Sequence, residues 1–293
     1  MTLAAKAWQA EPPPRAPITL AGWGRVALRG SVLGIVVFGG LGILLVGRLL
    51  EKPLFGLHRP WTPFITQGVC KAALAILGMG YHQRGPVMQG PGAMVANHCS
   101  WLDIFALNAA ARIYFVSKAE VARWPAIGWL AKATGTLFIN RAPAQAAAHK
   151  HSVETRLMAG HRLLLFPEGT STDGHRVLPF KSTLFAAFFT QSMTSSWQIQ
   201  PITLRYRAPA GKDARFYGWW GAMAFLPHLL DVLATPHQGA VEVICLKPLK
   251  VADFPNRKAL AAHCERAIRH AHKQGAGTPH SKAPSLPLRP HKK

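Results

Sequence analysis

An uncharged run of 17 residues, SVLGIVVFGGLGILLVG at positions 31–47, has to be shielded from water by a bilayer or by the rest of the protein. As a helix it would be about 26 Å long, slightly short of the roughly 30 Å hydrocarbon core of a membrane. Basic residues flank the run at Arg25, Arg29, Arg48 and Lys52. The preceding leader is too long and mixed for a cleaved signal peptide, and no small-residue cleavage site follows. We therefore expect a retained helix that associates with the membrane, with a soluble helical hairpin over the core as the alternative.

A second apolar stretch, residues 61–80, continues this segment. Lys71 interrupts it, and Trp61 stands at its start in the manner of an interfacial anchor. We expect this stretch to lie in the membrane surface. The basic residues on the two sides of the first run are too evenly matched to set its orientation, so the topology stays open.

The chain is strongly basic: Lys and Arg together number 34 against 12 Asp and Glu, a formal net charge of +22. Such a field attracts polyanions, either nucleic acid or an anionic lipid surface. The basic residues are spread over the chain without a helix-turn-helix, RNP or zinc-finger pattern. We therefore expect an anionic membrane surface as partner and no nucleic acid. A non-enzymatic membrane or nucleic-acid binding protein is the alternative of another class.

Four cysteines, none in a C-x-x-C pair, are spread through the chain at Cys70, Cys99, Cys245 and Cys264. They indicate neither a zinc site nor a disulfide framework, which favours a reducing compartment. The 14 histidines form no pattern of metal ligands. We expect no metal and no cofactor, and a membrane protein whose active site faces the cytoplasm.

From about residue 82, short apolar runs alternate with helical stretches, as in an α/β domain. The runs predicted as strands are AMVAN, RIYFVS, GTLFIN, RLLLFP, QIQPITLRY and AVEVICL. The predicted helices fall at roughly 101–110, 119–133, 143–159, 181–194 and 256–272. We predict a largely parallel central sheet flanked by helices, behind an N-terminal membrane-associating helical segment. The predicted division is 1–84 for the leader and membrane-associating helices, 85–272 for the α/β domain and 273–293 for a disordered basic tail.

His98 and Asp103 stand five residues apart in VANHCSWLDIF, at the junction of a predicted strand and a predicted helix. Deep inside one helix this spacing would turn the side chains about 140° apart, but an Asp in the first turn can reach back to a His in the preceding turn. The carboxylate would accept the imidazole N–H, fix the tautomer and leave the other nitrogen free as a base. The spacing alone is a weak signal in a chain with 14 His, so the position carries the hypothesis.

A second motif, LLLFPEGTSTDG at 163–174, ends a buried strand and then presents Glu168, Gly169 and Thr170. Ligands of open α/β sheets bind beyond the carboxyl ends of the strands, where these residues fall. A Glu after a strand is more often a surface group in a salt bridge, and this is the alternative.

The pairing of NHCSWLD with FPEGT resembles the motifs of the glycerolipid acyltransferase family, typified by 1-acylglycerol-3-phosphate acyltransferase. Residues 115–141 and PITL at 201–204 resemble further blocks of the same family, so that the resemblance covers about residues 85–250. It implies transfer of a fatty acyl chain from an acyl thioester, carried by coenzyme A or acyl carrier protein, to the free hydroxyl of a lyso-lipid.

The resemblance also implies roles, with His98 as general base and Asp103 as its partner. The residues expected to hold the polar head of the acceptor, from the motifs and their vicinity, are Lys118, Arg141, Glu168, Gly169, Thr170, Arg176 and Lys181. Because Lys118 and Arg141 are kept, we expect the acceptor to be 1-acyl-sn-glycerol-3-phosphate, which would give phosphatidic acid.

Ser171 departs from the family pattern, because members acting on phosphate acceptors usually carry Arg directly after E-G-T. A serine hydroxyl cannot replace the bidentate grip of a guanidinium on phosphate. Either Arg176 and Lys181 restore phosphate binding, or the acceptor is another lyso-lipid, such as a lyso-ornithine lipid.

Direct transfer through His98 needs no acyl-enzyme. Cys99 and Ser100 lie beside His98 and leave a covalent alternative, although we expect Ser100 to cap the following helix. Backbone N–H groups around Gly169 are candidates for stabilising the oxyanion. The aromatic stretch at 216–233 lines an acyl-chain groove, lies on the membrane or packs in the core, and the sequence leaves these three readings open.

Overall fold

A computed structural model describes residues 12–90, 92–139, 146–189 and 197–274. The helices are α2 (Leu20–Phe55), α3 (Thr62–Leu77), α4 (Asp103–Ala110), α5 (Ile127–Thr134), α6 (Ala146–Met158), α7 (Phe225–Ala234) and α8 (Arg257–Gln274). The strands are β1 (Gly80–Arg84), β2 (Gly92–Ala96), β3 (Tyr114–Lys118), β4 (Leu137–Ile139), β5 (Leu163–Leu165), β6 (Gln198–Arg207), β7 (Ala240–Cys245) and β8 (Leu249–Lys250). The 3-10 helices are η2 (Ala119–Arg123), η4 (Ser182–Phe188) and η5 (Val251–Asp253). Arg141 and the predicted tail from residue 275 onward lie outside the described residues.

The strands form one sheet in the order β1-β7-β6-β2-β5-β3-β4, with β8 pairing on β6. The neighbouring strands β6, β2, β5, β3 and β4 run parallel. Strand β7 is antiparallel to β6, and β1 is parallel to β7. The carboxyl ends of the parallel strands therefore share one edge of the sheet. The predicted α/β fold with a largely parallel sheet is confirmed.

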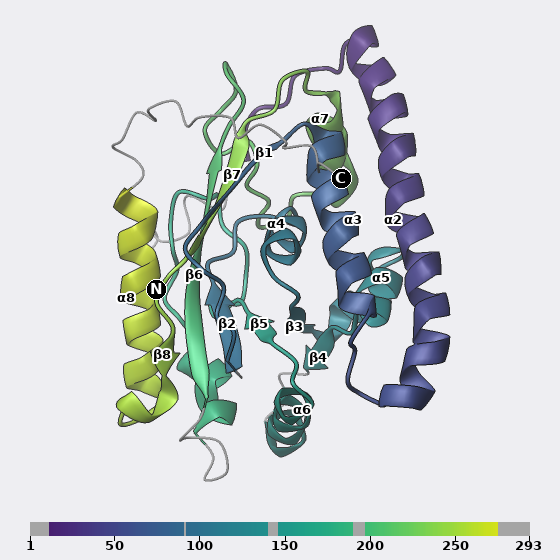
Figure 1. The fold of residues 1–293 in the computed structure, drawn as a ribbon. Helices are drawn as coiled ribbons and strands as arrows, with labels where there is room; N and C mark the ends of the chain where they lie inside the picture. The colour runs from purple at the N-terminus through teal and green to yellow at the C-terminus, as the bar shows by residue number, and fades with distance from the viewer. Residues whose placement is uncertain (1–11, 91, 140–145, 190–196, 275–293) are drawn as a thin grey trace, which may run out of the picture.

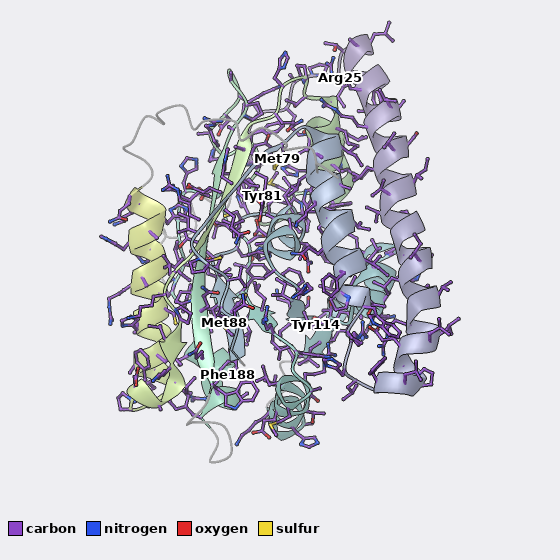
Figure 2. The ribbon with its side chains drawn as sticks, viewed as in Figure 1. Arg25, Met79, Tyr81, Met88, Tyr114 and Phe188 are labelled. Atoms are coloured by element: carbon purple, nitrogen blue, oxygen red, sulfur yellow. The ribbon has the colours of Figure 1, made fainter. Side chains whose placement is uncertain are left out.

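Helices cover both faces of the sheet, with α2, α3, α4 and α7 on one side and α6 and α8 on the other (Figure 1). Neighbouring residues of β2 point to opposite faces, as a pleated strand requires. Met94 joins the core beneath α3 and α4, while Val95 joins the core beneath α6 and α8. Figure 2 shows the same two cores through Met79 on the α3 side and Phe188 on the α8 side.

Some predicted elements differ from the observed ones. The helix expected at 119–133 is split into η2 and α5, because Pro125 has no N–H to donate and the preceding Trp124 is extended. The helix expected at 181–194 is a short 3-10 helix as far as the structure describes it. Strand β1, GYHQR, was not predicted because it contains no apolar run. Its side chains are half-buried or exposed at the edge of the sheet. Its pairing with β7 brings the end of the predicted leader into the sheet.

Helix α2 is 36 residues long and would measure about 54 Å. Of the described helices, it alone is long and apolar enough to cross a membrane. It packs closely on α3 at Gly40, where an added Cβ would overlap the side chain of Val69. Its apolar side chains that stay exposed include Leu28, Ile35, Phe38, Ile43, Val46, Leu49 and Leu50. A single apolar face of this extent indicates membrane association.

Three of the four basic residues that flank the uncharged run contact other parts of the protein, and the fourth, Lys52, is exposed. Arg25, labelled in Figure 2, and Arg29 donate hydrogen bonds to backbone carbonyls at the C-terminal end of α7. The helix dipole is negative at this end. Arg48 donates to the buried carboxylate of Glu51, which also accepts the backbone N–H groups that begin α3. The N-terminal part of α2 is thereby fixed on α7, and its C-terminal part is fixed on the start of α3.

Helix α3 covers the core instead of lying at the surface. Leu74 and Leu77 are buried against the sheet side of the molecule, and α3 packs between α2 and α4. Trp61 and Phe64, at the N-terminal end of the helix, stay about half exposed. The expectation that residues 61–80 lie in the membrane surface therefore fits only this end, because the rest of α3 fills the space between α2 and the sheet.

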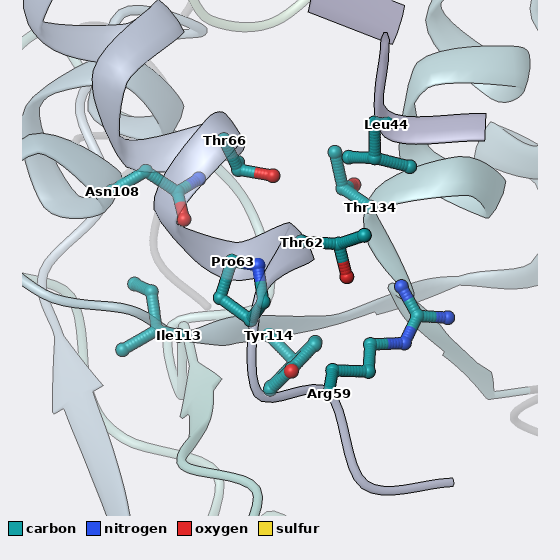
Figure 3. A pocket seen from close by; sticks show the side chains of 9 residues that line it. All are labelled: Leu44, Arg59, Thr62, Pro63, Thr66, Asn108, Ile113, Tyr114 and Thr134. Carbon is teal, nitrogen blue, oxygen red and sulfur yellow. The ribbon is translucent and has the colours of Figure 1, made fainter. Parts of the chain in front are cut away.

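A small pocket lies beneath the turn between α2 and α3 (Figure 3). Its lining residues are Leu44, Arg59, Thr62, Pro63, Thr66, Asn108, Ile113, Tyr114 and Thr134. Tyr114 is the first residue of β3, so the pocket lies at the edge where the parallel strands begin. It is therefore remote from the edge that carries the two predicted motifs.

Candidate active site

The turn between β2 and α4 is held by Asn97. Its amide oxygen accepts the N–H of Leu204 at 2.8 Å, and its amide nitrogen donates to the Leu204 carbonyl at 3.0 Å. The side chain thereby prolongs the pairing of β2 with β6. His98 follows at the carboxyl edge of the sheet, and α4 begins at Asp103.

His98 and Asp103 are in contact, with Nδ1 of the imidazole 2.7 Å from Oδ2 of the carboxylate. Asp103 is fully buried, whereas the His98 side chain is 20% exposed. The same Oδ2 accepts the backbone N–H groups of Cys99 at 2.8 Å and Ser100 at 3.1 Å. Because a carboxylate only accepts, Nδ1 carries the proton, and Nε2 of a neutral imidazole is left with its lone pair. The contact expected from the spacing is present in the structure.

Tyr206 completes the surroundings of Asp103. Its hydroxyl donates to Oδ1 at 2.7 Å from the end of β6. No motif in the sequence signals this residue, which is 103 positions from Asp103. The pairing of β6 with β2 brings the two together.

Three residues of the second motif contact His98. The Phe166 ring stacks on the imidazole with centroids 4.0 Å apart. The Glu168 carboxylate accepts the N–H of His98 at 2.8 Å, and the N–H of Thr172 donates to the His98 carbonyl at 2.9 Å. The structure thus brings the two predicted motifs together. Phe166 and Thr172 lie within the quoted motif, but their contacts with His98 could not be derived from the sequence.

Glu168 faces the protein in this structure. One carboxylate oxygen accepts from His98 and the other accepts the N–H of Leu178 at 2.7 Å. The residue is only 2% exposed. Burial raises its pKa to about 8, against the opposing effect of the two backbone hydrogen bonds. The Glu168 side chain is therefore placed to fix the His98 turn, and its contact with the lipid acceptor stays a prediction.

Known proteins resemble this chain in sequence and in fold. A family model described as Acyltransferase matches residues 79–205. A lyso-ornithine lipid O-acyltransferase of Rhodobacter capsulatus is 59% identical, covering 88% of this chain and 94% of that protein. A second one, of Pseudomonas aeruginosa, is 32% identical over 84% of this chain and 93% of the relative. This chain belongs to the acyltransferase family.

Other members of the family have names that state a phosphate-bearing acceptor. A 1-acyl-sn-glycerol-3-phosphate acyltransferase of Neisseria gonorrhoeae is 31% identical over 68% of this chain and 77% of the relative. The solved 1-acyl-sn-glycerophosphate acyltransferase PlsC of Thermotoga maritima shares the fold, with a TM-score of 0.63 and 18% identity over 90% of this chain and 97% of that one. The protein is therefore an acyltransferase acting on lyso-lipids.

The other predicted binding residues that the structure describes lie at the end of β3 and in the segment after β5. Lys118 is exposed at the end of β3. Strand β5 lies between β3 and β2, the strand that His98 follows. Thr170 and Lys181 are also exposed. Arg176 forms an ion pair with Asp173 at 2.9 Å. The contacts of these side chains with a lipid stay a prediction, as does the role of Arg141, which lies outside the described residues.

Gly169 occupies the left-handed region with φ 73°, where glycine is favoured. Its N–H donates to the Phe166 carbonyl at 3.0 Å. Of the backbone N–H groups that the sequence suggested for an oxyanion, that of Gly169 is therefore used within the turn, and a role for its neighbours stays a prediction. The glycine shapes the turn that presents Glu168 to His98.

The structure gives Cys99 and Ser100 a different environment from that of a nucleophile. Both side chains are fully buried. Burial raises the pKa of the Cys99 thiol well above its usual value, and nearby carboxylates add to this effect. The prediction that Ser100 caps α4 is wrong: its Oγ has no hydrogen-bond partner among the described residues, and the Asp103 carboxylate accepts the Ser100 N–H instead.

The aromatic stretch at 216–233 divides between core and surface. Trp220 and Tyr217 are almost fully buried, whereas Leu226 of α7 is 60% exposed. The N–H of Trp219 donates to the Cys99 carbonyl at 2.9 Å. This segment therefore packs directly on the turn that carries His98, and Trp219 contacts Trp124 edge to face.

Proposed function

We propose that this acyltransferase moves a fatty acyl chain from an acyl thioester to the hydroxyl of a lyso-ornithine lipid, with His98 as general base. The observation that carries the proposal is the His98–Asp103 contact at the carboxyl edge of the sheet, which leaves Nε2 as the free ring nitrogen. The similarity to lyso-ornithine lipid O-acyltransferases supports the choice of acceptor.

In the proposed reaction, Nε2 of His98 takes the proton of the acceptor hydroxyl as its oxygen attacks the thioester carbonyl. Asp103 stabilises the resulting imidazolium through Nδ1. When the tetrahedral intermediate collapses, the C–S bond breaks and the leaving thiolate takes the proton from the imidazolium. An ester and a free thiol result, and no acyl-enzyme forms.

The acceptor differs from the one that the sequence alone favoured. Ser171 stands where phosphate-acceptor members carry Arg, and it offers no positive charge. The charge of Arg176 is balanced by the ion pair with Asp173, which weakens its case as a substitute. Both observations support lyso-ornithine lipid over 1-acyl-sn-glycerol-3-phosphate.

The donor is an acyl thioester of coenzyme A or of acyl carrier protein. Both carriers are acidic, and the net charge of +22 suits either one. The exposed apolar side chains of α2 would hold the enzyme on the bilayer that contains the acceptor. We further propose that the active site faces the cytoplasm, where the described cysteines stay as free thiols.

The acceptor is tested with the purified full-length protein in liposomes, supplied with each donor in turn. Lyso-ornithine lipid and 1-acyl-sn-glycerol-3-phosphate are compared at equal concentrations by the rate of labelled acyl transfer. We expect kcat/KM for lyso-ornithine lipid to be at least about 100-fold higher, since a site that lacks a phosphate partner leaves a dianion unpaired. Equal or faster acylation of the phosphate acceptor would refute the assignment.

A further inference from the structure

The two oxygens of the Asp103 carboxylate have different partners. Oδ2 accepts from the His98 ring and from the backbone N–H groups of Cys99 and Ser100. Within the part of the chain that the structure describes, Oδ1 has a single hydrogen-bond donor, the hydroxyl of Tyr206 at 2.7 Å. Asp103 is fully buried, so water cannot replace that donor without a rearrangement.

We propose that Tyr206 is a positioning residue of the acyl transfer, whose hydroxyl fixes the plane of the Asp103 carboxylate and thereby the ring of His98. The inference rests on the proposed function, in which His98 is the base. Tyr206 acts through Asp103, and no contact with substrate is assigned to it.

The fold delivers Tyr206 to this position through strand pairing. Asn97 bonds both backbone groups of Leu204, two residues before Tyr206, and so fixes the end of β6 against the His98 turn. The Tyr206 ring also packs on Tyr217, with centroids 5.6 Å apart. The fixed backbone and the contact with Tyr217 together limit the freedom of the Tyr206 hydroxyl.

The hydroxyl remains a donor throughout the working pH range. Burial raises the pKa of Tyr206 well above its usual value, and the neighbouring Asp103 charge acts in the same direction. A hydroxyl that donates to Oδ1 withdraws negative charge from the carboxylate. Without it, Asp103 would stabilise the imidazolium more strongly, and the orientation of the His98 ring would loosen.

Other titratable groups also face this site. Glu168 and Asp173 come from the loop after β5, Cys99 from the His98 turn, and Tyr217 from the segment before α7. All of them are unchanged when Tyr206 alone is replaced. A difference between the pH profiles of the two proteins therefore reports on the Tyr206 hydroxyl.

The test compares Tyr206→Phe with Tyr217→Phe, because both remove one buried phenol hydroxyl from the same aromatic pair. The Tyr217 hydroxyl bonds Gln238 and Gly239 and does not touch Asp103. For Tyr206→Phe we expect kcat to fall about tenfold with KM within about twofold, the size of one lost hydrogen bond to a charged group. The acid limb of the kcat/KM profile should move to higher pH in this variant alone.

Replacement of Tyr206 by 3-fluorotyrosine provides an independent measurement if the Phe variant folds poorly. The fluorinated phenol keeps its shape and donates more strongly, so the acid limb should move to lower pH. The inference would be overturned if Tyr206→Phe and the 3-fluorotyrosine protein both kept the wild-type kcat and the wild-type pH profile. It would also be overturned if Tyr217→Phe shifted the acid limb as much as Tyr206→Phe does. His98→Ala in the same assay separates the two claims, because its retained activity would refute the base itself and leave Tyr206 nothing to position.

Discussion

At the scale of single residues, Glu168 offers a test of how the two motifs cooperate. In Glu168→Gln, the amide NH2 would face either the His98 N–H or the Leu178 N–H, because the carboxylate now accepts both. A buried donor without an acceptor costs about 1–3 kcal/mol, so the thermal midpoint should fall. We also expect acyl transfer to fall at least about tenfold, because the His98 turn loses one of its supports.

The matched control for this change is Glu154→Gln, the same chemical substitution on α6. Acyl-transfer rates and thermal unfolding are measured for both variants and the wild type. We expect the control to behave as wild type. Equal activity and stability in Glu168→Gln would show that the buried carboxylate does not organise the site.

The sequence identified the residues of the two motifs but not how they are used. His98 and Asp103 could be paired from their spacing at a strand–helix junction, and this contact is present at 2.7 Å. Tyr206 could not be found, because its approach to Asp103 depends on which strand pairs with β2. Glu168 was expected near the acceptor, but whether a carboxylate faces ligand or backbone depends on loop geometry that residue type does not determine.

At the scale of secondary structure, the packing of α2 on α3 depends on one glycine. An added side chain at Gly40 would overlap Val69, whereas Gly42 on the same helix has nothing within 4 Å. Gly40→Val should therefore separate the two helices and destabilise the protein by about 1–3 kcal/mol. Gly42→Val carries the same change in helix propensity and should leave the stability unchanged or slightly raised.

Thermal unfolding of both glycine variants in one detergent measures this difference. A lower midpoint for Gly40→Val alone is the expected result. Equal midpoints for the two variants would mean that α2 is not held against α3 as the structure describes.

The elements with strong apolar runs could be predicted, and the weakly patterned ones could not. Buried strands such as β5, LLL, stand out because both of their faces are covered by helices. Strand β1 is polar because it lies at the sheet edge, and the break between η2 and α5 depends on Pro125. Arg25 and Arg29, which flank the uncharged run, cap the C-terminal end of α7. Their partners lie about 200 positions away and have no local signature.

At the scale of the whole molecule, the two faces of the sheet are covered by helices with different side chains. The α2 face carries exposed apolar side chains, while α8 covers the opposite face of the sheet and is rich in basic residues (Figure 1). The edge that carries His98 and Asp103 lies between these layers, at the carboxyl ends of the parallel strands. Composition and the pattern of apolar runs predicted a basic, membrane-associated α/β protein, and the family relation then identified a lyso-lipid acyltransferase. Neither composition nor pattern could choose the acceptor, because this depends on a few polar groups around one edge.

The proposed base is tested most directly by the rate of acyl transfer to lyso-ornithine lipid in liposomes that hold equal amounts of folded wild-type protein or His98→Ala. General-base catalysis contributes about 100-fold or more, so the variant should lose at least that factor in kcat while its thermal midpoint stays near that of the wild type. A rate within about tenfold of the wild type would contradict the role of His98 in removing the proton of the lipid hydroxyl.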